Sequence, residues 1–255
     1  MLIIRPEQMR ALEQAQVERF ANELVAHIKT FAPIQFKSMG EDAVRNTISI
    51  GIKQSRQYGF TLRGPVRFYV EMMFILGSYF DTDPQYHGII QALFDKNEAD
   101  EMSRADRLHE ALLAYIETVS GKGHDYERLA INRALQAQFD NVVEFADRPS
   151  SDLVNVLYKI HPEKVQALGE AAIAALVNKA YAIAEQRGSS WVAARPLFAG
   201  LMFTLGHGCF ADPQFHWIAR TLNNTESTDT ITVLKHLYQK FFIFLNQAKS
   251  NMEMG

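Results

Sequence analysis

Two histidines at matching places in the chain are the residues best suited to chemistry. His87 lies four residues after Asp83, and His216 lies four residues after Asp212. Two imidazoles could act as metal ligands or proton carriers if their segments face each other in the fold. No further metal-ligating residues recur around them at a suitable spacing, so we expect a structural or surface role for both histidines.

The two aspartates are each followed by proline, a combination that fits the start of a helix. The pairs are Asp83-Pro84 and Asp212-Pro213. A carboxylate in this place accepts hydrogen bonds from first-turn N–H groups that have no partner within the helix. Proline suits the first helical position, where its missing N–H is not needed. We therefore predict that both aspartates are structural N-caps.

Other catalytic and metal-binding motifs are incomplete. His109-Glu110 begins like the zinc motif of a metalloprotease helix, but Leu113 stands where the second histidine is required. The chain has no Gly-x-Ser-x-Gly elbow and no dinucleotide fingerprint. Cys209 follows His207 by two residues, and side chains at that spacing on a helix point to different faces. We predict that Cys209 is a core residue, and that the protein is not an enzyme and binds no metal, haem or nucleotide.

The histidines match because the sequence repeats itself at an offset of 129 residues. Segment 73–89 aligns without a gap on segment 202–218, and nine of these 17 positions are identical. Ordinary composition would give about one identity in fifteen. The same offset pairs Leu24-Val25 with Leu153-Val154. We therefore predict a tandem duplication, with one helical repeat unit at 1–123 and a second at 124–255.

Helix signals fill both units, and no convincing strand pattern is visible. The second expected helix stops at Gly59, a residue suited to the left-handed conformation after a helix end. Asp147-Arg148-Pro149-Ser150-Ser151 interrupts the second unit's counterpart of the long first helix. The predicted fold is all-α, a duplicated five-helix unit forming two pseudo-symmetric bundles that could also pack as one compact domain. The expected helices span 6–30, 40–58, 61–79, 83 onward, 103–119, 126–146, 153–159, 163–187, 191–210, 213–222 and 229–248.

Two glycines lie within or at the end of strongly apolar helical segments. They are Gly77 and Gly206, which match each other at the repeat offset. Glycine in a helix costs about 1 kcal/mol relative to alanine, so another group is expected to approach closely. We predict tight helix packing at both positions.

Composition and charge exclude several classes of partner. The 255 residues are 47% hydrophobic, which is enough for a substantial core. A net charge of −3 provides no field that would attract nucleic acid or an anionic membrane. The apolar run 241–245 is far too short to span a bilayer, and a single cysteine fits a reducing compartment. We expect a cytoplasmic protein that neither binds nucleic acid nor inserts into a membrane.

Several short sequence segments within about the first 95 residues are similar to those of a family of small bacterial proteins. Genes of that family tend to lie beside spike, PAAR-type and effector-adaptor genes of type VI secretion. The resemblance implies an accessory role near secreted toxins in the bacterial cytoplasm. It is carried by Ile4-Arg5-Pro6-Glu7-Gln8-Met9, Gly40-Glu41, Tyr58-Gly59, Met73-Phe74-Ile75-Leu76-Gly77, Phe80 and Asp83-Pro84.

From the resemblance we expect a chaperone or co-chaperone that binds a type VI effector or its adaptor for loading. The cargo is expected on the surface between the two units, where exposed aromatic residues would be anchors. We predict Tyr86, Phe215 and Trp217 as these anchors, with His87 and His216 beside them. Two alternatives stay open: an immunity protein that neutralises a type VI toxin, and a helical ligand-binding protein or enzyme that uses the two histidines.

Overall fold

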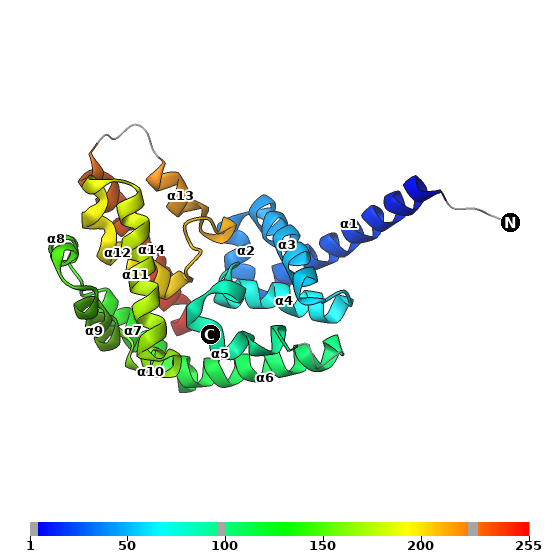
Figure 1. Cartoon of the computed structure of the whole chain (residues 1–255), viewed down its shortest axis with the longest axis horizontal. Helices are drawn as coiled ribbons and strands as arrows, with labels where there is room; N and C mark the ends of the chain where they lie inside the picture. Colours follow the sequence, from blue (N-terminus) through cyan, green and yellow to red (C-terminus); the bar gives the residue numbers. More distant parts are fainter. Residues whose placement is uncertain (1–4, 96–99, 224–228, 255) are drawn as a thin grey trace.

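The computed structural model describes residues 5–95, 100–223 and 229–254, and these ranges consist of helices and connecting turns (Figure 1). No strand occurs within them, so the all-α prediction is confirmed. Ile4, the first residue of the phrase that carries the family resemblance, lies outside the described ranges.

The first half of the chain opens with its longest helix, α1 (Pro6–Phe31). Two helical stretches then form the rest of its body, connected by short turns. The first comprises α2 (Pro33–Met39), α3 (Glu41–Ser55), η1 (Arg56–Tyr58) and α4 (Arg63–Leu76). The second comprises η2 (Phe80–Thr82), η3 (Pro84–Tyr86), α5 (His87–Ile90), η4 (Gln91–Leu93) and α6 (Glu101–Ser120).

The second half has a similar order of elements, except that its opening is divided. The opening comprises η5 (Lys122–His124), α7 (Asp125–Ala134), α8 (Phe139–Glu144), η6 (Phe145–Asp147) and α9 (Ser150–Ile160). The remainder comprises α10 (Pro162–Leu168), α11 (Glu170–Gln186), η7 (Ser189–Ala194), α12 (Arg195–Leu205), η8 (Pro213–Phe215), α13 (His216–Leu222) and α14 (Thr230–Met254).

Local signals predicted two of the helix breaks correctly. Gly59 follows η1 with φ of +71° and ψ of +22°, which is the left-handed conformation expected at this stop. The predicted interruption near residue 149 is also present, because η6 ends at Asp147 and Pro149 precedes the first residue of α9. Proline and the extended conformation of Arg148 prevent the helix from continuing.

The predicted single helix over 163–187 is wrong. Gly169 adopts φ of +82°, which ends α10, and the chain bends by 102° before α11. Gly40 does the same with φ of +79° between α2 and α3, and α2 itself was not predicted. Glycine permits this conformation without a side-chain clash, and the turn lets both neighbouring helices contact the body of the fold. By length and composition, no single described helix could cross a membrane; the bent α10–α11 pair passes that test only when taken together.

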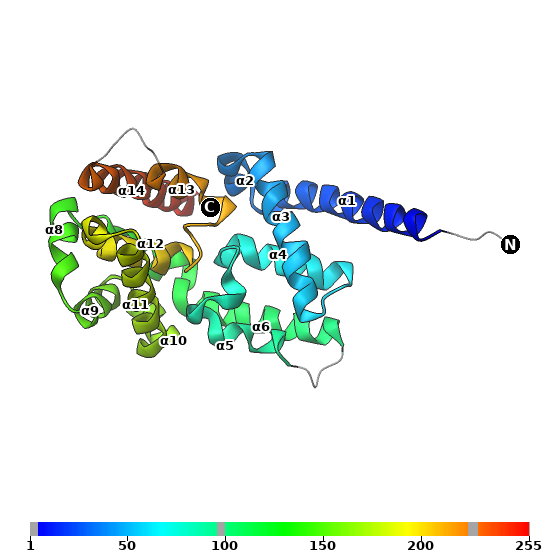
Figure 2. The same cartoon turned by 45° about the horizontal axis from the view of Figure 1, so that its top comes forward.

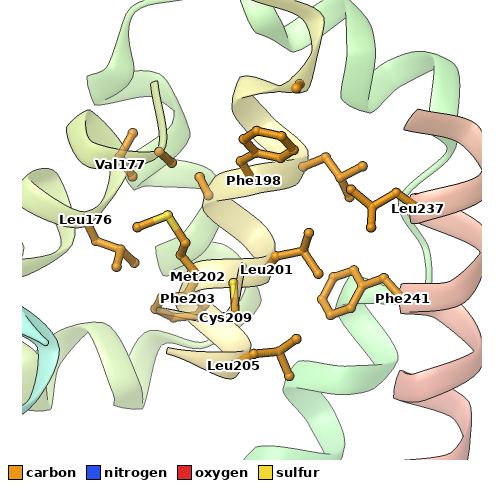
Figure 3. Close-up of a cluster of buried hydrophobic side chains, with 14 of the residues drawn as sticks. Leu176, Val177, Phe198, Leu201, Met202, Phe203, Leu205, Cys209, Leu237 and Phe241 are labelled. Atoms are coloured by element: carbon orange, nitrogen blue, oxygen red, sulfur yellow. The ribbon is translucent and has the colours of Figure 1, made fainter. Parts of the chain in front are cut away.

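The buried apolar side chains form two clusters. One contains residues between Leu24 and Leu112, and the other contains residues between Ile131 and Leu245. Figure 3 shows the second cluster, in which Phe198, Leu201 and Met202 of α12 lie among side chains from the neighbouring helices. Close packing of apolar side chains around α4 and α12 therefore stabilises each half.

The two halves meet through short elements that each half extends toward the other, and α6 also packs against α10. Turn η3 of the first half packs against α11, and turn η8 of the second half packs against α3. The N-terminal part of α1, by contrast, projects away from the body, as both views show (Figures 1 and 2).

Candidate functional site

The repeated segments 73–89 and 202–218 lie at the junction between the halves and exchange hydrogen bonds. The backbone N–H of His207 donates to Asp83 Oδ2 over 2.6 Å, and the backbone N–H of Ser78 donates to Asp212 Oδ2 over 2.7 Å. These two bonds are related by the 129-residue offset. Ser78 adds a second bond, from Oγ to Asp212 Oδ1, at 2.6 Å. Each aspartate thus binds the turn that follows the apolar helix of the opposite half.

Two glutamines at the junction repeat this exchange. Gln85 Nε2 donates to the carbonyl of Met202 over 3.1 Å, and Gln214 Nε2 donates to the carbonyl of Met73 over 2.7 Å. Both side chains are buried. Sequence reasoning did not single out these glutamines, although their identity at the repeat offset was a signal that could have found them.

The predicted caps are confirmed. Asp83 Oδ1 accepts the backbone N–H of Gln85, and Asp212 Oδ1 accepts that of Gln214, both at 2.9 Å. Pro84 and Pro213 occupy the first helical positions, as expected. Burial raises the pKa of Asp212, while its hydrogen bonds with Ser78 and Gln214 act in the opposite direction. Each aspartate is therefore a local cap and, with its other oxygen, a link between the halves.

Gly77 and Gly206 are close-packing positions, as predicted. A Cβ atom on Gly77 would lie 2.9 Å from the carbonyl oxygen of Leu205, and one on Gly206 would lie 3.1 Å from that of Leu76. Their φ angles are +97° and +91°, a region that side chains rarely adopt. The close neighbour is thus the backbone at the end of the opposite helix, so glycine is needed for two reasons at once.

The histidines singled out from the sequence lie at the surface. His87 and His216 are both exposed, and no cluster of three metal-ligating side chains forms among the described residues. A different imidazole, that of His207, lies at the junction between Thr82 Oγ1 at 3.2 Å and Lys179 Nζ at 2.9 Å. Burial lowers the pKa of His207, and the nearby Lys179 acts in the same direction.

The predicted aromatic anchors differ in exposure. Tyr86 is only 3% exposed and packs edge-on against Tyr115 of α6 at a ring distance of 5.7 Å. The prediction that Tyr86 is an exposed anchor is therefore wrong, because α6 covers its ring. Phe215 and Trp217 are half-buried, and both rings pack against Phe244 of α14. The sequence predicted that these three aromatic residues lie near helix starts. It did not predict that α6 would pack against Tyr86, or that α14 would pack against Phe215 and Trp217.

A pocket of about 230 Å³ lies in the second half, outside the residues predicted from the sequence. Its walls come from α7, α8, η6, α9, α12 and α14. Side chains of Val142, Phe145, Leu157, Phe203 and Phe241 make its surface almost wholly apolar. Sequence reasoning missed the pocket because its lining is spread over residues 134 to 242. The predicted interruption before Ser150 was the sequence feature that could have indicated the pocket, because it lets α8 lie against α12.

The polar groups that line the pocket are largely occupied by the protein itself. Tyr238 Oη donates to the carbonyl of Ala137 over 2.7 Å, and Thr204 Oγ1 donates to the carbonyl of Gly200 over 2.8 Å. Asn141 is exposed. A Cβ atom added to Gly200 would meet nothing within 4 Å, so this side of α12 is open space. The pocket can therefore offer apolar contact to a guest, with little competing hydrogen bonding.

The buried Cys209 and Lys164 are the remaining groups whose chemistry the fold changes. Cys209 is 1% exposed and lies in the second core cluster, as predicted, and burial raises its pKa. Lys164 Nζ donates to the carbonyl of Phe203 over 2.5 Å, near the C-terminal end of α12. Burial lowers the pKa of Lys164 to about 8, against the opposing influence of Asp83 and Glu127. Both groups are enclosed by the fold rather than presented in the pocket.

Comparison with protein-family models, curated proteins and solved structures finds no match to this chain.

Proposed function

We propose that the protein is a non-enzymatic binding protein whose apolar pocket receives side chains of a protein partner. The observation that carries this proposal is the pocket between α8, α9, α12 and α14, whose lining is almost entirely apolar. A buried apolar anchor in such a pocket is the usual source of affinity in a protein interface. The occupied hydroxyls of Tyr238 and Thr204 further favour an apolar guest.

The size of the pocket favours side chains over a large cofactor. Its volume of about 230 Å³ is below the roughly 300–1,000 Å³ typical of sites for drug-sized ligands. One or two large apolar side chains of a partner helix or loop are a better match. The exposed amide-bearing Asn141 lies at the rim, where it could bond to the partner's backbone.

We further propose that the two halves are duplicated modules, with units at 1–123 and 124–255 related by a pseudo-twofold axis. The reciprocal bonds of Asp83 and Asp212, and those of Gln85 and Gln214, support this proposal. In an arrangement with twofold symmetry, each contact occurs twice with the partners exchanged. The two separate apolar clusters support it as well.

The resemblance to proteins encoded beside type VI secretion genes gives the partner's identity in this proposal. The guest would be a type VI effector or its adaptor, held in the bacterial cytoplasm before loading. The half-buried rings of Phe215 and Trp217 stay candidates for a secondary contact. Tyr86 does not, because its ring is buried beneath α6.

Filling the pocket tests this function directly. Gly200→Leu would place an isobutyl group into the open space beside α12, whereas Gly200→Ala adds only a methyl group and serves as the matched control. Each purified variant would be titrated in a calorimeter with any effector or adaptor protein that is encoded near its gene. We expect Gly200→Leu to weaken binding at least about 30-fold, as for a lost hot spot, and Gly200→Ala to bind like wild type.

Equal affinity of all three proteins for the partner would contradict the role of the pocket. Failure of every neighbouring effector and adaptor to bind would contradict the type VI assignment. Gene deletion then separates the two versions of that assignment. Loss of a chaperone should lower the amount or secretion of the toxin, whereas loss of an immunity protein should make the cell sensitive to its siblings at unchanged toxin levels.

A further inference from the structure

The first eleven residues of α1 form an exposed arm. Every side chain from Pro6 to Gln16 is exposed, including Met9 at 46% and Leu12 at 54%. Figures 1 and 2 both show this part of α1 extending away from the rest of the chain. A helix of this length gains little stability on its own in water, so packing against a further surface would stabilise it.

The second half contains a counterpart of this arm. The phrase Arg10-Ala11-Leu12 recurs as Arg133-Ala134-Leu135, and each phrase is soon followed by Gln-Ala-Gln, at 14–16 and 136–138. Farther along the chain, both copies continue into Leu-Val, at 24–25 and 153–154. By sequence and by order, segment 125–145 therefore corresponds to the N-terminal part of α1.

In the second half this counterpart folds back onto the body. Helix α7 packs against α9 and α14, and its Ala130 and Ile131 are buried. Ala134 and Ala137, together with Val142 of α8, form one side of the apolar pocket. The folded-back segment is therefore the cover of a surface whose floor is made by α9, α12 and α14.

The first half has the equivalent floor without that cover. The repeat offset relates the pocket residues Ile160, Thr204 and Phe242 to Phe31, Ile75 and Leu113. These three side chains are 42%, 42% and 52% exposed. They come from α1, α4 and α6, the counterparts of α9, α12 and α14.

Two groups of contacts and the spacing of residues along α4 and α6 place these side chains on one surface. We call it the open floor (Phe31, His27, Glu71, Ile75, Phe68, His109 and Leu113). The rings of His27 and Phe31 stack at 5.6 Å, and His27 Nε2 lies 2.6 Å from Glu71 Oε1. The rings of Phe68 and His109 meet edge-on at 5.5 Å. Ile75 lies one turn after Glu71, and Leu113 lies one turn after His109, so both extend this surface.

The arm cannot cover the open floor of its own chain. Helix α1 is continuous from Pro6 to Phe31, and the floor includes Phe31 at its C-terminal end. The second half can fold back because η6 and the turn before Pro149 interrupt the equivalent helix. A cover for the open floor must therefore come from another molecule.

We propose that the arm of a second copy of this chain covers the open floor, and that the two copies exchange arms in a symmetric dimer. We expect the arm to fit the open floor, because segment 125–145, its counterpart in the second half, already covers the equivalent surface within the chain. Met9 and Leu12 would supply the apolar contact for Phe31, Ile75 and Leu113. Glu13, one turn after Met9, would approach Arg67, whose side chain is 56% exposed at the edge of the floor. An exchange of this kind closes on itself and leaves no open end for further association.

Sedimentation velocity of the full-length protein over a range of concentrations tests the proposal. The wild-type chain should reach twice its monomer mass as concentration rises. Leu12→Glu in the arm and Leu113→Glu in the floor should each raise the dimer dissociation constant at least about 100-fold, because each change alters both interfaces of the dimer. Both side chains are exposed in a single chain, so both variants should stay folded. Ile243→Glu, at a 57% exposed position on α14, is the matched control and should dimerise like wild type.

Mixing the two defective variants gives the sharper result. In a mixed dimer one interface would contain both glutamates, while the other would join an intact arm to an intact floor. The mixture should therefore dimerise more tightly than either variant alone. A wild-type protein that stays monomeric at its highest soluble concentration overturns the proposal, as does a dimer that survives both substitutions. Loss of dimer without rescue in the mixture overturns the exchange of arms.

The dimer and the pocket use different halves of the chain, so the two proposals can fail separately. Gly200→Leu should leave the dimer intact, and Leu113→Glu should leave partner binding in the pocket intact.

Discussion

Asp83 and Asp212 each use one carboxylate oxygen to cap their own helical turn and the other to bind a backbone N–H in the opposite half of the chain. The bonds to His207 and Ser78 are 2.6 and 2.7 Å long. Hydrogen bonds to a charged acceptor are stronger than those between neutral groups. The same residue therefore fixes a local turn and the relation between two halves whose apolar clusters are separate.

Replacing Asp212 with asparagine should destabilise the protein. One of its oxygens would become an NH2 group, which cannot accept hydrogen bonds. Either the bond from Ser78 N–H to Oδ2 is lost, or the bonds from Ser78 Oγ and Gln214 N–H to Oδ1 are lost. We expect the free energy of unfolding in urea to fall by about 1–3 kcal/mol, the usual cost of a buried donor without a partner. Asp42→Asn, at an exposed position in the first turn of α3, is the control and should change stability by less than about 0.5 kcal/mol. Equal losses of unfolding free energy from the two substitutions would contradict a stabilising role for the hydrogen bonds of Asp212 at the junction.

Adding a single methyl group at Gly77 or Gly206 should separate the ends of α4 and α12. Each new Cβ would meet a backbone carbonyl of the opposite helix, in addition to the unfavourable positive φ. We expect Gly77→Ala and Gly206→Ala each to lower the free energy of unfolding by about 2–4 kcal/mol, measured by urea denaturation. Gly88→Ala places its methyl group in open space on an exposed helical residue and should be nearly neutral. A neutral result at Gly77 and Gly206 would show that the helix ends do not meet as described.

The buried Lys164 should make stability depend on pH in the alkaline range. Its pKa falls from 10.5 to about 8 in the folded protein, so between these values the unfolded state binds more protons than the folded state. The free energy of unfolding should therefore rise with pH through this window. Relative to Lys164→Met, which cannot titrate, the wild type should gain up to about 1.5 kcal/mol between pH 8 and 9.5.

The ionisation of buried tyrosines sets the highest pH at which the effect of Lys164 can be measured. Burial raises the pKa of Tyr58 and of Tyr69, so their ionisation favours the unfolded state at pH 10 and above. Both proteins contain these tyrosines, and the difference between their pH profiles removes the shared effect. Parallel profiles for wild type and Lys164→Met from pH 8 to 9.5 would show that Lys164 is hydrated rather than buried.

Cys209 should be unreactive toward thiol reagents in the folded protein. Its side chain is buried, and the raised pKa leaves little of the reactive thiolate at pH 8. We expect a thiol reagent such as DTNB to react with Cys209 at least about 100-fold more slowly in native protein than in urea. The variant Ser189→Cys adds a thiol at an exposed position in η7, away from the arm and the open floor, and should react rapidly in the native state. Rapid modification of Cys209 in wild-type protein would instead indicate an open second core.

Local chemistry explains which parts of the fold could be predicted from the sequence. The caps at Asp83 and Asp212 depend on bonds to residues two positions away, and the stop at Gly59 depends on one backbone conformation. The break at Gly169 was missed although the residue type permits it. Glycine also occurs inside helices, as at Gly200, and only the packing of the neighbouring helices selects between the two conformations.

The sequence alone determined the all-α class and the helix caps, because these depend on composition, periodicity and neighbouring residues. It also contains the match between segments 73–89 and 202–218. Tertiary structure decided what each repeated residue meets: the second oxygens of Asp83 and Asp212 bind across the junction, and Tyr86 lies beneath α6. It also decided that one opening segment folds back to form a pocket while the other extends as an arm. These outcomes depend on contacts between residues far apart in the chain, which no local pattern specifies.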